Sequence, residues 1–225
     1  MKISCSVYII RTTNLNIINY CYVVIDNETK KTALIDPSWN IDSIIKVVNN
    51  IGGLVEKVFL THSHIDHINL ADECAERFNA QIYMSEIEIN TYGFSCKNLL
   101  GVRDRQIVNI GKTNVHCIST PGHTAGSMCF YCDGNFFTGD TVFIEGCGMC
   151  DFPGASPDDM YHSLRKIKSI IPKDTIIYPA HSYGEKVGKP FGYLLNNNVY
   201  FNIDNKEHFI KFRMRKDQKG LFDFK

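Results

Sequence analysis

A short segment rich in histidine and aspartate, residues 62–67 with the sequence HSHIDH, is the part of this chain best suited to metal chemistry. His62 and His64 lie two positions apart at the end of a predicted strand. Their imidazoles point to the same side and can share one metal ion, because side chains alternate along an extended chain. Asp66 continues the same alternation, whereas the adjacent His67 points elsewhere. One loop thus presents ligands to two neighbouring places, which predicts two metal ions rather than one.

Two metal ions need more ligands than one loop supplies, so further ligands are expected at the ends of other strands. Three residues meet this expectation: His123, Asp140 and His181 each follow a predicted strand directly. A single histidine in a loop is more often a solvated surface residue, but five histidines and two aspartates in this arrangement indicate a metal site. The remaining histidines fit no such pattern and are expected to be structural or surface residues: His116, His162 and His208.

The segments before the histidine loop are expected to form strands and one helix that position it. Residues 19–26 and 32–35 are β-branched and apolar and flank a turn, which predicts a hairpin. Apolar residues follow helical spacing over 41–48, and Gly52-Gly53 ends that helix. A strand over 55–61 then runs directly into the loop.

The segments after the loop are expected to alternate helices and strands in the same way. An Asp-Gly turn at 133–134 is the strongest hairpin signal of the chain. Ser156 is suited to cap a helix, with proline at its first position and acidic residues in its first turn. Hairpins followed by helices occur in both halves, which indicates two sheets stacked face to face with helices outside. The expected helices are 71–78, 85–92 and the one opening at Ser156, and the expected strands are 81–84, 106–110, 114–119, 128–132, 136–138 and 175–178.

Length and composition indicate an ordinary globular protein. The chain has 225 residues, of which 44% are apolar and 21% charged, and we expect one domain over 1–225 with 186–225 as a short C-terminal extension. The 24 basic residues equal the 24 acidic residues, so no global field favours nucleic acid or an anionic membrane as a partner.

The beginning of the chain lacks a secretory pattern, and no stretch approaches the length of a membrane span. A cytoplasmic location is therefore expected. The nine cysteines are scattered through apolar, strand-like contexts and are expected to be reduced. Cys129 and Cys132 are three apart in a strand and face opposite sides, so a second zinc site built from them and from the pair Cys147 and Cys150 is not expected.

The seven candidate ligands together resemble the metal-ligand pattern of the metallo-β-lactamase fold superfamily, over roughly residues 1–185. The resemblance implies an α/β protein with the four-layer αβ/βα sandwich of that fold. It implies two metal ions, Zn²⁺ by preference, with iron or manganese also suited to mixed nitrogen and oxygen donors. Asp140 would bridge the ions, and Asp66 would also hold the catalytic hydroxide. The implied ligands of the first ion are His62, His64 and His123, and those of the second are Asp66, His67 and His181.

Single positions narrow the function within this superfamily. Where its β-lactamases usually have cysteine or serine, this chain has Asp140, which favours thioester or phosphoester hydrolysis. His64 argues against a flavo-diiron oxidoreductase, which would carry glutamate there. Too few residues follow His181 for the extra domains of the RNA-processing members.

Residues 138–148 resemble the corresponding stretch of glyoxalase II, a hydroxyacylglutathione hydrolase, and Tyr183 matches a tyrosine that contacts glutathione there. The chain departs from that family at Met149 and Asp151, where glyoxalase II has a basic residue and an aromatic one. An acid would repel the carboxylate of glutathione, so a thioester on another carrier is expected. The expected substrate-binding residues are Met149, Tyr183 and Cys147.

A closer resemblance covers nearly the whole chain and is to the zinc-dependent hydrolases of trans-acyltransferase polyketide biosynthesis. It rests on residues 19–26, 146–150 and 206–210. It implies a thioesterase-type enzyme whose partner is a small-molecule thioester or an acyl carrier protein. As a strand, residues 211–215 would show a basic face suited to an acidic carrier, although a solvated edge strand is the simpler interpretation.

Two other functions remain open at this point. One is glyoxalase II-like hydrolysis of hydroxyacylglutathione. The other belongs to a different class, because persulfide dioxygenases share this fold and bind one iron through residues equivalent to His62, His123 and Asp140. A non-catalytic metal-binding module is a further alternative.

Overall fold

The computed structural model describes residues 4–216, and its core is a pair of six-stranded sheets. In the first sheet, β1 to β3 are antiparallel and β3 to β6 are parallel. The strands lie in sequence order: β1 (Cys5–Asn14), β2 (Ile17–Asp26), β3 (Lys31–Ile35), β4 (Leu54–Phe59), β5 (Gln81–Ser85) and β6 (Leu99–Val102).

The second sheet is mainly antiparallel, and only β10 and β11 run parallel. Its spatial order is β12-β11-β10-β9-β8-β7. The strands are β7 (Ile107–Ile110), β8 (Thr113–Ser119), β9 (Met128–Cys132), β10 (Asn135–Gly139), β11 (Ile176–Pro179) and β12 (Lys189–Pro190).

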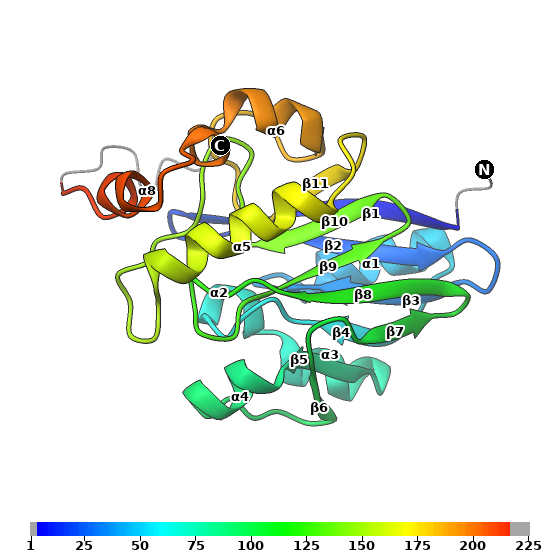
Figure 1. Cartoon of the computed structure of the whole chain (residues 1–225). Helices are drawn as coiled ribbons and strands as arrows, with labels where there is room; N and C mark the ends of the chain where they lie inside the picture. Colours follow the sequence, from blue (N-terminus) through cyan, green and yellow to red (C-terminus); the bar gives the residue numbers. More distant parts are fainter. Residues whose placement is uncertain (1–3, 217–225) are drawn as a thin grey trace.

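Helices cover the outer faces of both sheets, and α5 lies along the second sheet with α6 and α8 near it (Figure 1). The helices are α1 (Ile41–Ile51), α2 (Ile65–Ile68), α3 (Ala71–Phe78), α4 (Glu86–Tyr92), α5 (Pro157–Ile170), α6 (Phe191–Asn197), α7 (Val199–Asn202) and α8 (Lys206–Arg213). Within residues 4–216, no helix is both long enough and apolar enough to cross a lipid bilayer.

Three apolar clusters connect these layers. In β2, Val23 faces the cluster under α1 and α3, whereas its neighbour Val24 faces the cluster between the sheets. Cys129 and Cys132 of β9 divide in the same way, one toward α5 and one toward the first sheet. Side chains on both faces of each sheet are therefore buried, which gives helix, sheet, sheet and helix as the four expected layers.

The C-terminal part of the described chain departs from the expected strand. Residues 206–213 form α8, whose Asn205 side chain accepts a hydrogen bond from the backbone of His208. The alternation of basic and apolar residues from 211 to 215 is therefore not displayed by a strand. Arg213 is only 4% exposed and its guanidinium donates to the Tyr200 hydroxyl at 3.1 Å, so it does not contribute to a basic surface. Residues 217–225 of the expected extension lie outside the described residues.

A buried aspartate connects the two sheets at the end remote from the histidine loop. Asp26 accepts hydrogen bonds from Thr29 through one oxygen, and from Lys112 and Thr113 through the other. Burial alone would raise the pKa of Asp26, but these hydrogen bonds outweigh burial and lower the pKa to about 2. The carboxylate thus stabilises the folded protein wherever it is ionised.

We expect Asp26→Asn to lower the free energy of unfolding at pH 7 by about 2 kcal/mol, since one pKa unit corresponds to about 1.4 kcal/mol. The pKa of Asp26 is depressed on folding from 3.8 to about 2. The stabilisation is therefore present above pH 4 and is lost as the pH falls toward 2. Urea unfolding of wild type and Asp26→Asn between pH 2 and 7 would measure the difference in their free energies of unfolding. Asp174→Asn, at an exposed position, is the control. A difference in unfolding free energy that stays the same at pH 2 would contradict a stabilising role of the ionised carboxylate.

Candidate metal centre

The seven candidate residues lie together at one edge of the paired sheets. Residues 62–67 follow β4 of the first sheet, and the last three of them lie in α2. The other three follow strands of the second sheet: His123 after β8, Asp140 after β10 and His181 after β11. Strand ends of two packed sheets are rigid supports, which suits the narrow tolerances of metal coordination.

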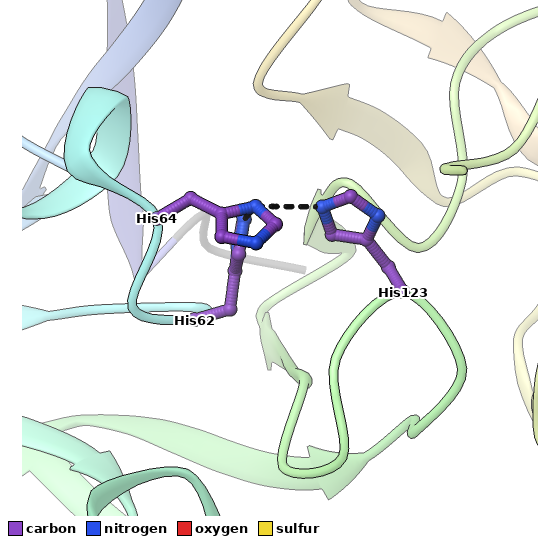
Figure 2. A group of neighbouring side chains, drawn as sticks. All are labelled: His62, His64 and His123. Carbon is purple, nitrogen blue, oxygen red and sulfur yellow. Dashed lines mark hydrogen bonds between the residues drawn. The ribbon is translucent and has the colours of Figure 1, made fainter. Parts of the chain in front are cut away.

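Three histidines form the first group, and Figure 2 shows their rings turned toward one another from two separate loops. His64 Nδ1 lies 3.0 Å from His62 Nε2 and 3.0 Å from His123 Nε2. One ring nitrogen from each residue lies within 4.8 Å of the other two, which is a spacing that one metal ion can fill. The group corresponds to the expected first set of ligands.

Asp66, His67 and His181 form a second group with the same compactness. His181 Nε2 lies 3.2 Å from Asp66 Oδ2, and His67 Nε2 lies 3.6 Å from the same oxygen. The parity argument from the sequence agrees with the geometry only in part, because His67 groups with Asp66 and His181 but also forms a compact group with His62 and Asp140. The ring of His67 packs against that of His62, with centroids 4.0 Å apart, so the two groups adjoin.

Asp140 lies between the two groups and divides its oxygens between them. Its Oδ2 is 3.5 Å from His123 Nε2, whereas its Oδ1 is 3.5 Å from His67 Nε2 and 3.6 Å from His181 Nε2. Gly139 makes this position possible, because at its φ of 48° a Cβ would lie 2.3 Å from Thr61 Oγ1. Glycine therefore lets the end of β10 approach the loop that follows β4.

Two buried atoms of the site have no hydrogen-bond partner within the described chain, namely His67 Nε2 and Asp140 Oδ1. Buried polar atoms are nearly always satisfied by a partner, so such a pair needs an explanation. Both atoms face the space between the two groups, where a cation would satisfy them. The donor set of imidazole nitrogens and carboxylate oxygens therefore fits a metal ion.

Hydrogen bonds behind the rings fix which nitrogen faces the centre. Two rings are held by backbone carbonyl groups, since His123 Nδ1 lies 2.8 Å from Met149 O and His181 Nδ1 lies 2.7 Å from Ile18 O. The other two are held by side chains: His67 Nδ1 lies 3.0 Å from Asp36 Oδ2, and His62 Nδ1 lies 3.1 Å from Thr61 Oγ1. With Nδ1 donating, Nε2 keeps its lone pair for a metal ion. His64 differs, since its Nδ1 faces the other two rings.

Asp36 supports both the histidine loop and His67. It accepts hydrogen bonds from the backbone and the hydroxyl of Thr61, in addition to its contact with His67. Its φ of 45° is in the left-handed region, which an aspartate adopts at a cost. This backbone conformation at the end of β3 directs the carboxylate under the loop.

The electrostatics of the two groups differ. Burial lowers the pKa of His62 well below its usual value and lowers that of His64 to about 4, assisted by the neighbouring imidazoles. Burial also would lower the pKa of His67, but the carboxylates of Asp66 and Asp140 outweigh it and raise that pKa to about 10. The first group is therefore neutral at pH 7, whereas the metal-free second group holds a proton.

A cavity of about 180 Å³ opens above the centre. Its floor is formed by five of the candidate ligands, and its walls are apolar or aromatic. No lysine or arginine is present among the described residues that line it. The floor residues are His64, Asp66, His123, Asp140 and His181, and the wall residues are Ile17, Phe143, Met149, Phe152 and Tyr183.

Residues 15–181 match the family model described as the metallo-beta-lactamase superfamily. The chain belongs to this superfamily. The match begins in the turn before β2 and ends at His181, so it includes all seven candidate ligands.

Two similar members of the superfamily extend over almost the whole chain. The probable polyketide biosynthesis zinc-dependent hydrolase PksB of Bacillus subtilis is 44% identical and covers 100% of both chains. The corresponding protein BaeB of Bacillus velezensis is 48% identical over 92% of each chain. A hydroxyacylglutathione hydrolase of an Enterobacter species is 34% identical over 73% of this chain and 62% of its own.

Solved structures agree with this fold. ETHE1 from Myxococcus xanthus has a TM-score of 0.82 at 27% identity and covers 96% of this chain and 95% of its own. The metallo-beta-lactamase from Staphylococcus aureus has a TM-score of 0.84 at 24% identity, over 96% of this chain and 68% of its own. The predicted αβ/βα sandwich of the superfamily is confirmed.

The predicted substrate-binding residues divide into two sets. Met149 and Tyr183 line the cavity, and Tyr183 packs against Phe143 with ring centroids 4.6 Å apart. Cys147 does not line it: the residue is 4% exposed and belongs to the apolar cluster under α5, together with Cys150. Its expected contact with substrate is therefore not supported. Burial raises the pKa of the Cys147 thiol to about 12, so it stays protonated.

Sequence patterns gave no indication of several residues that support the site. Asn19 donates to the backbone and the carboxylate of Asp66 at 3.0 and 3.1 Å, and it accepts a hydrogen bond from Trp39. Ile17 and Phe152 line the cavity from the start of β2 and from the loop before α5. None of them carries a local signal, because asparagine and apolar residues at strand ends are common in all folds.

Proposed function

We propose that this protein is a dinuclear, zinc-dependent hydrolase of acyl thioesters. The observation that carries the proposal is the position of Asp140, whose two oxygens face two separate ligand groups. A residue in this position can bridge two ions, and the orphaned atoms His67 Nε2 and Asp140 Oδ1 provide the reason for a cation there. The names of the two similar full-length relatives support zinc and hydrolysis.

The ligands would divide as the two groups divide. His62, His64 and His123 would hold one ion, and Asp66, His67 and His181 the other, with Asp140 shared. Imidazole-rich donor sets favour zinc, and iron or manganese is compatible with the carboxylates. The chemistry that such a pair of ions supplies is a water whose pKa is near neutral and a polarised carbonyl oxygen.

Asp66 is the residue of the protein best placed to act on the attacking water. Burial would raise the pKa of its carboxyl group, but His67, His181 and Asn19 hold that pKa well below its usual range. The carboxylate is therefore ionised at neutral pH and can accept a hydrogen bond from the water. Asn19 fixes the orientation of this carboxylate by donating a hydrogen bond to Asp66 Oδ2. The Asp66 side chain is 18% exposed, which leaves it accessible from the cavity.

The walls of the cavity favour an acyl group on a neutral carrier arm. Ile17, Phe143 and Phe152 offer apolar surface to an acyl chain. Glutathione carries two carboxylates, and no cation among the described lining residues would pair with them. Asp151 is exposed and precedes the lining residue Phe152, so it adds a negative charge to this segment. We therefore infer a pantetheine-type thioester, free or on an acyl carrier protein in polyketide biosynthesis, as the substrate.

A substrate panel tests this function. With zinc-loaded enzyme we expect free thiol release from acyl-pantetheine, acyl-coenzyme A or acyl carrier protein. The value of kcat/KM for the corresponding acyl-glutathione should be lower by roughly tenfold or more, because a single unpaired charge is worth about 1.4 kcal/mol or more. A preference for acyl-glutathione would contradict the carrier assignment and favour the glyoxalase II-like function.

Metal analysis of the same preparation tests the other class of function. We expect two zinc ions per chain. One iron per chain, with oxygen uptake in the presence of glutathione persulfide, would instead support the dioxygenase alternative and contradict hydrolysis.

A further inference from the structure

Glu88, in the first turn of α4, is a fully buried carboxylate beside the metal centre. It contacts neither a candidate ligand nor the cavity directly. Instead its two oxygens accept four hydrogen bonds from the two loops that carry the three-histidine group. A buried carboxylate is costly unless it is fully hydrogen-bonded, so this arrangement needs a role that justifies the charge.

Each oxygen of Glu88 serves one loop. Oε1 accepts from the backbone nitrogen and the hydroxyl of Ser63, at 2.8 and 2.7 Å. Ser63 stands between His62 and His64 in the sequence. Oε2 accepts from the Thr124 hydroxyl at 2.8 Å and from the Gly126 nitrogen at 3.0 Å, directly after His123.

The contact depends on an unusually close approach of α4 to the His123 loop. A Cβ on Gly126 would lie 2.2 Å from the backbone nitrogen of Glu88, so only glycine fits there. Tyr92, one turn further along α4, accepts a hydrogen bond from the Ala125 nitrogen at 3.1 Å. The helix thus holds this loop at two points.

The two loops belong to different sheets. The histidine loop follows β4 of the first sheet, and the His123 loop connects β8 and β9 of the second. Glu88 therefore joins the two sheets at the point where their histidines must converge. Metal ligands need to be held to within about 0.2 Å of their ideal distances, which the packing of two sheets alone does not guarantee.

We propose that Glu88 is the positioning residue that sets the distance between His123 and the His62–His64 pair, and thereby the metal affinity of the three-histidine group. The inference rests on the metal-ligand assignment of the proposed function. Both oxygens accept from a backbone N–H group, so a glutamine cannot replace the carboxylate. Its amide nitrogen would face either Ser63 N–H or Gly126 N–H as a second donor.

The test compares zinc binding to metal-free wild type and Glu88→Gln. Zinc is titrated against a competing chelator, and nuclear magnetic resonance of the histidine ring nitrogens identifies which group is filled. We expect the dissociation constant of the three-histidine group to rise by roughly 10- to 100-fold, the usual effect of removing a group that orients a ligand. The affinity of the Asp66, His67 and His181 group should not change.

The matched control is Glu86→Gln in the same helix turn. Glu86 is an exposed carboxylate that pairs with Arg103, and neither residue touches the metal centre. If Glu88 had only a structural role, Glu88→Gln would lower thermal stability without a selective effect on one group. Zinc affinities that are both unchanged, or both lowered equally, would therefore overturn the proposal. If wild type binds no zinc in the three-histidine group, the proposed function itself fails, whatever Glu88 does.

Two milder variants decide the matter if Glu88→Gln does not fold. Ser63→Ala removes one donor to Oε1, and Thr124→Val removes one donor to Oε2. Each should weaken zinc binding in the three-histidine group alone, by less than Glu88→Gln. Unchanged affinity in both variants would refute the positioning role.

Discussion

Asp140→Ala should lower kcat/KM for a thioester by more than about 100-fold, since even groups behind the ligands contribute 10- to 100-fold to a metal site. Asp140 is the only one of the seven candidate ligands whose atoms approach both groups through separate oxygens. In the proposed dinuclear centre, its removal would take an anion from between the two ions and leave each with one ligand fewer. We therefore expect at least one zinc ion to be lost during dialysis.

Zinc content and hydrolysis rate, measured on the same sample, check this expectation. Asp151→Ala is the matched control, because it removes a nearby aspartate that is exposed and outside the two groups. It should keep both zinc ions. Full turnover by Asp140→Ala with two bound zinc ions would exclude a bridging role.

The sequence predicted the location of the centre because its ligands come in a pattern that strands impose. His62 and His64 share a side by alternation, and His123, Asp140 and His181 each follow a strand. Strand ends of packed sheets meet at one edge, so residue type and strand position together predicted which side chains converge. This inference needed only local information, which is why it agrees with the geometry.

Contacts between residues far apart in the sequence could not be predicted in this way. Asn19 and Asp66 are 47 positions apart, and Glu88 and Gly126 are 38 apart. Their contacts depend on how the sheets stack and where α4 lies, which no period in the sequence encodes. Glu88 in particular has the sequence environment of an exposed residue in a short helix, yet it is fully buried.

The C-terminal segment shows the opposite case, in which a local sequence pattern predicts the wrong secondary structure. A run in which basic and apolar residues alternate has the period of a strand, but residues 206–213 are helical. The helix is selected by packing, because Phe209 enters the apolar cluster under α5 and Arg213 donates to Tyr200. Tertiary contacts therefore override a short local pattern, as they often do for segments of this length.

Zinc affinity at the two groups should depend on pH in different ways. In the metal-free protein the pKa of His67 is raised to about 10. Burial would lower it, but the carboxylates of Asp66 and Asp140 outweigh the effect of burial. The Nδ1 proton of His67 is held by Asp36, so the proton that must leave before zinc binds is the one on Nε2. Each unit by which the pH falls below 10 therefore lowers the apparent zinc affinity of this group about tenfold.

Between pH 6 and pH 8 the zinc affinity of the Asp66, His67 and His181 group should thus rise about 100-fold, with release of about one proton per ion. Burial lowers the pKa values of His62, His64 and His123, so these rings give up a proton more readily than His67 does. The three-histidine group should then bind zinc with nearly constant affinity. Calorimetric titration in buffers of different ionisation enthalpy counts the protons. Equal pH dependence of the two groups would show that His67 does not hold this proton, and that Asp66 and Asp140 do not act on it as the geometry requires.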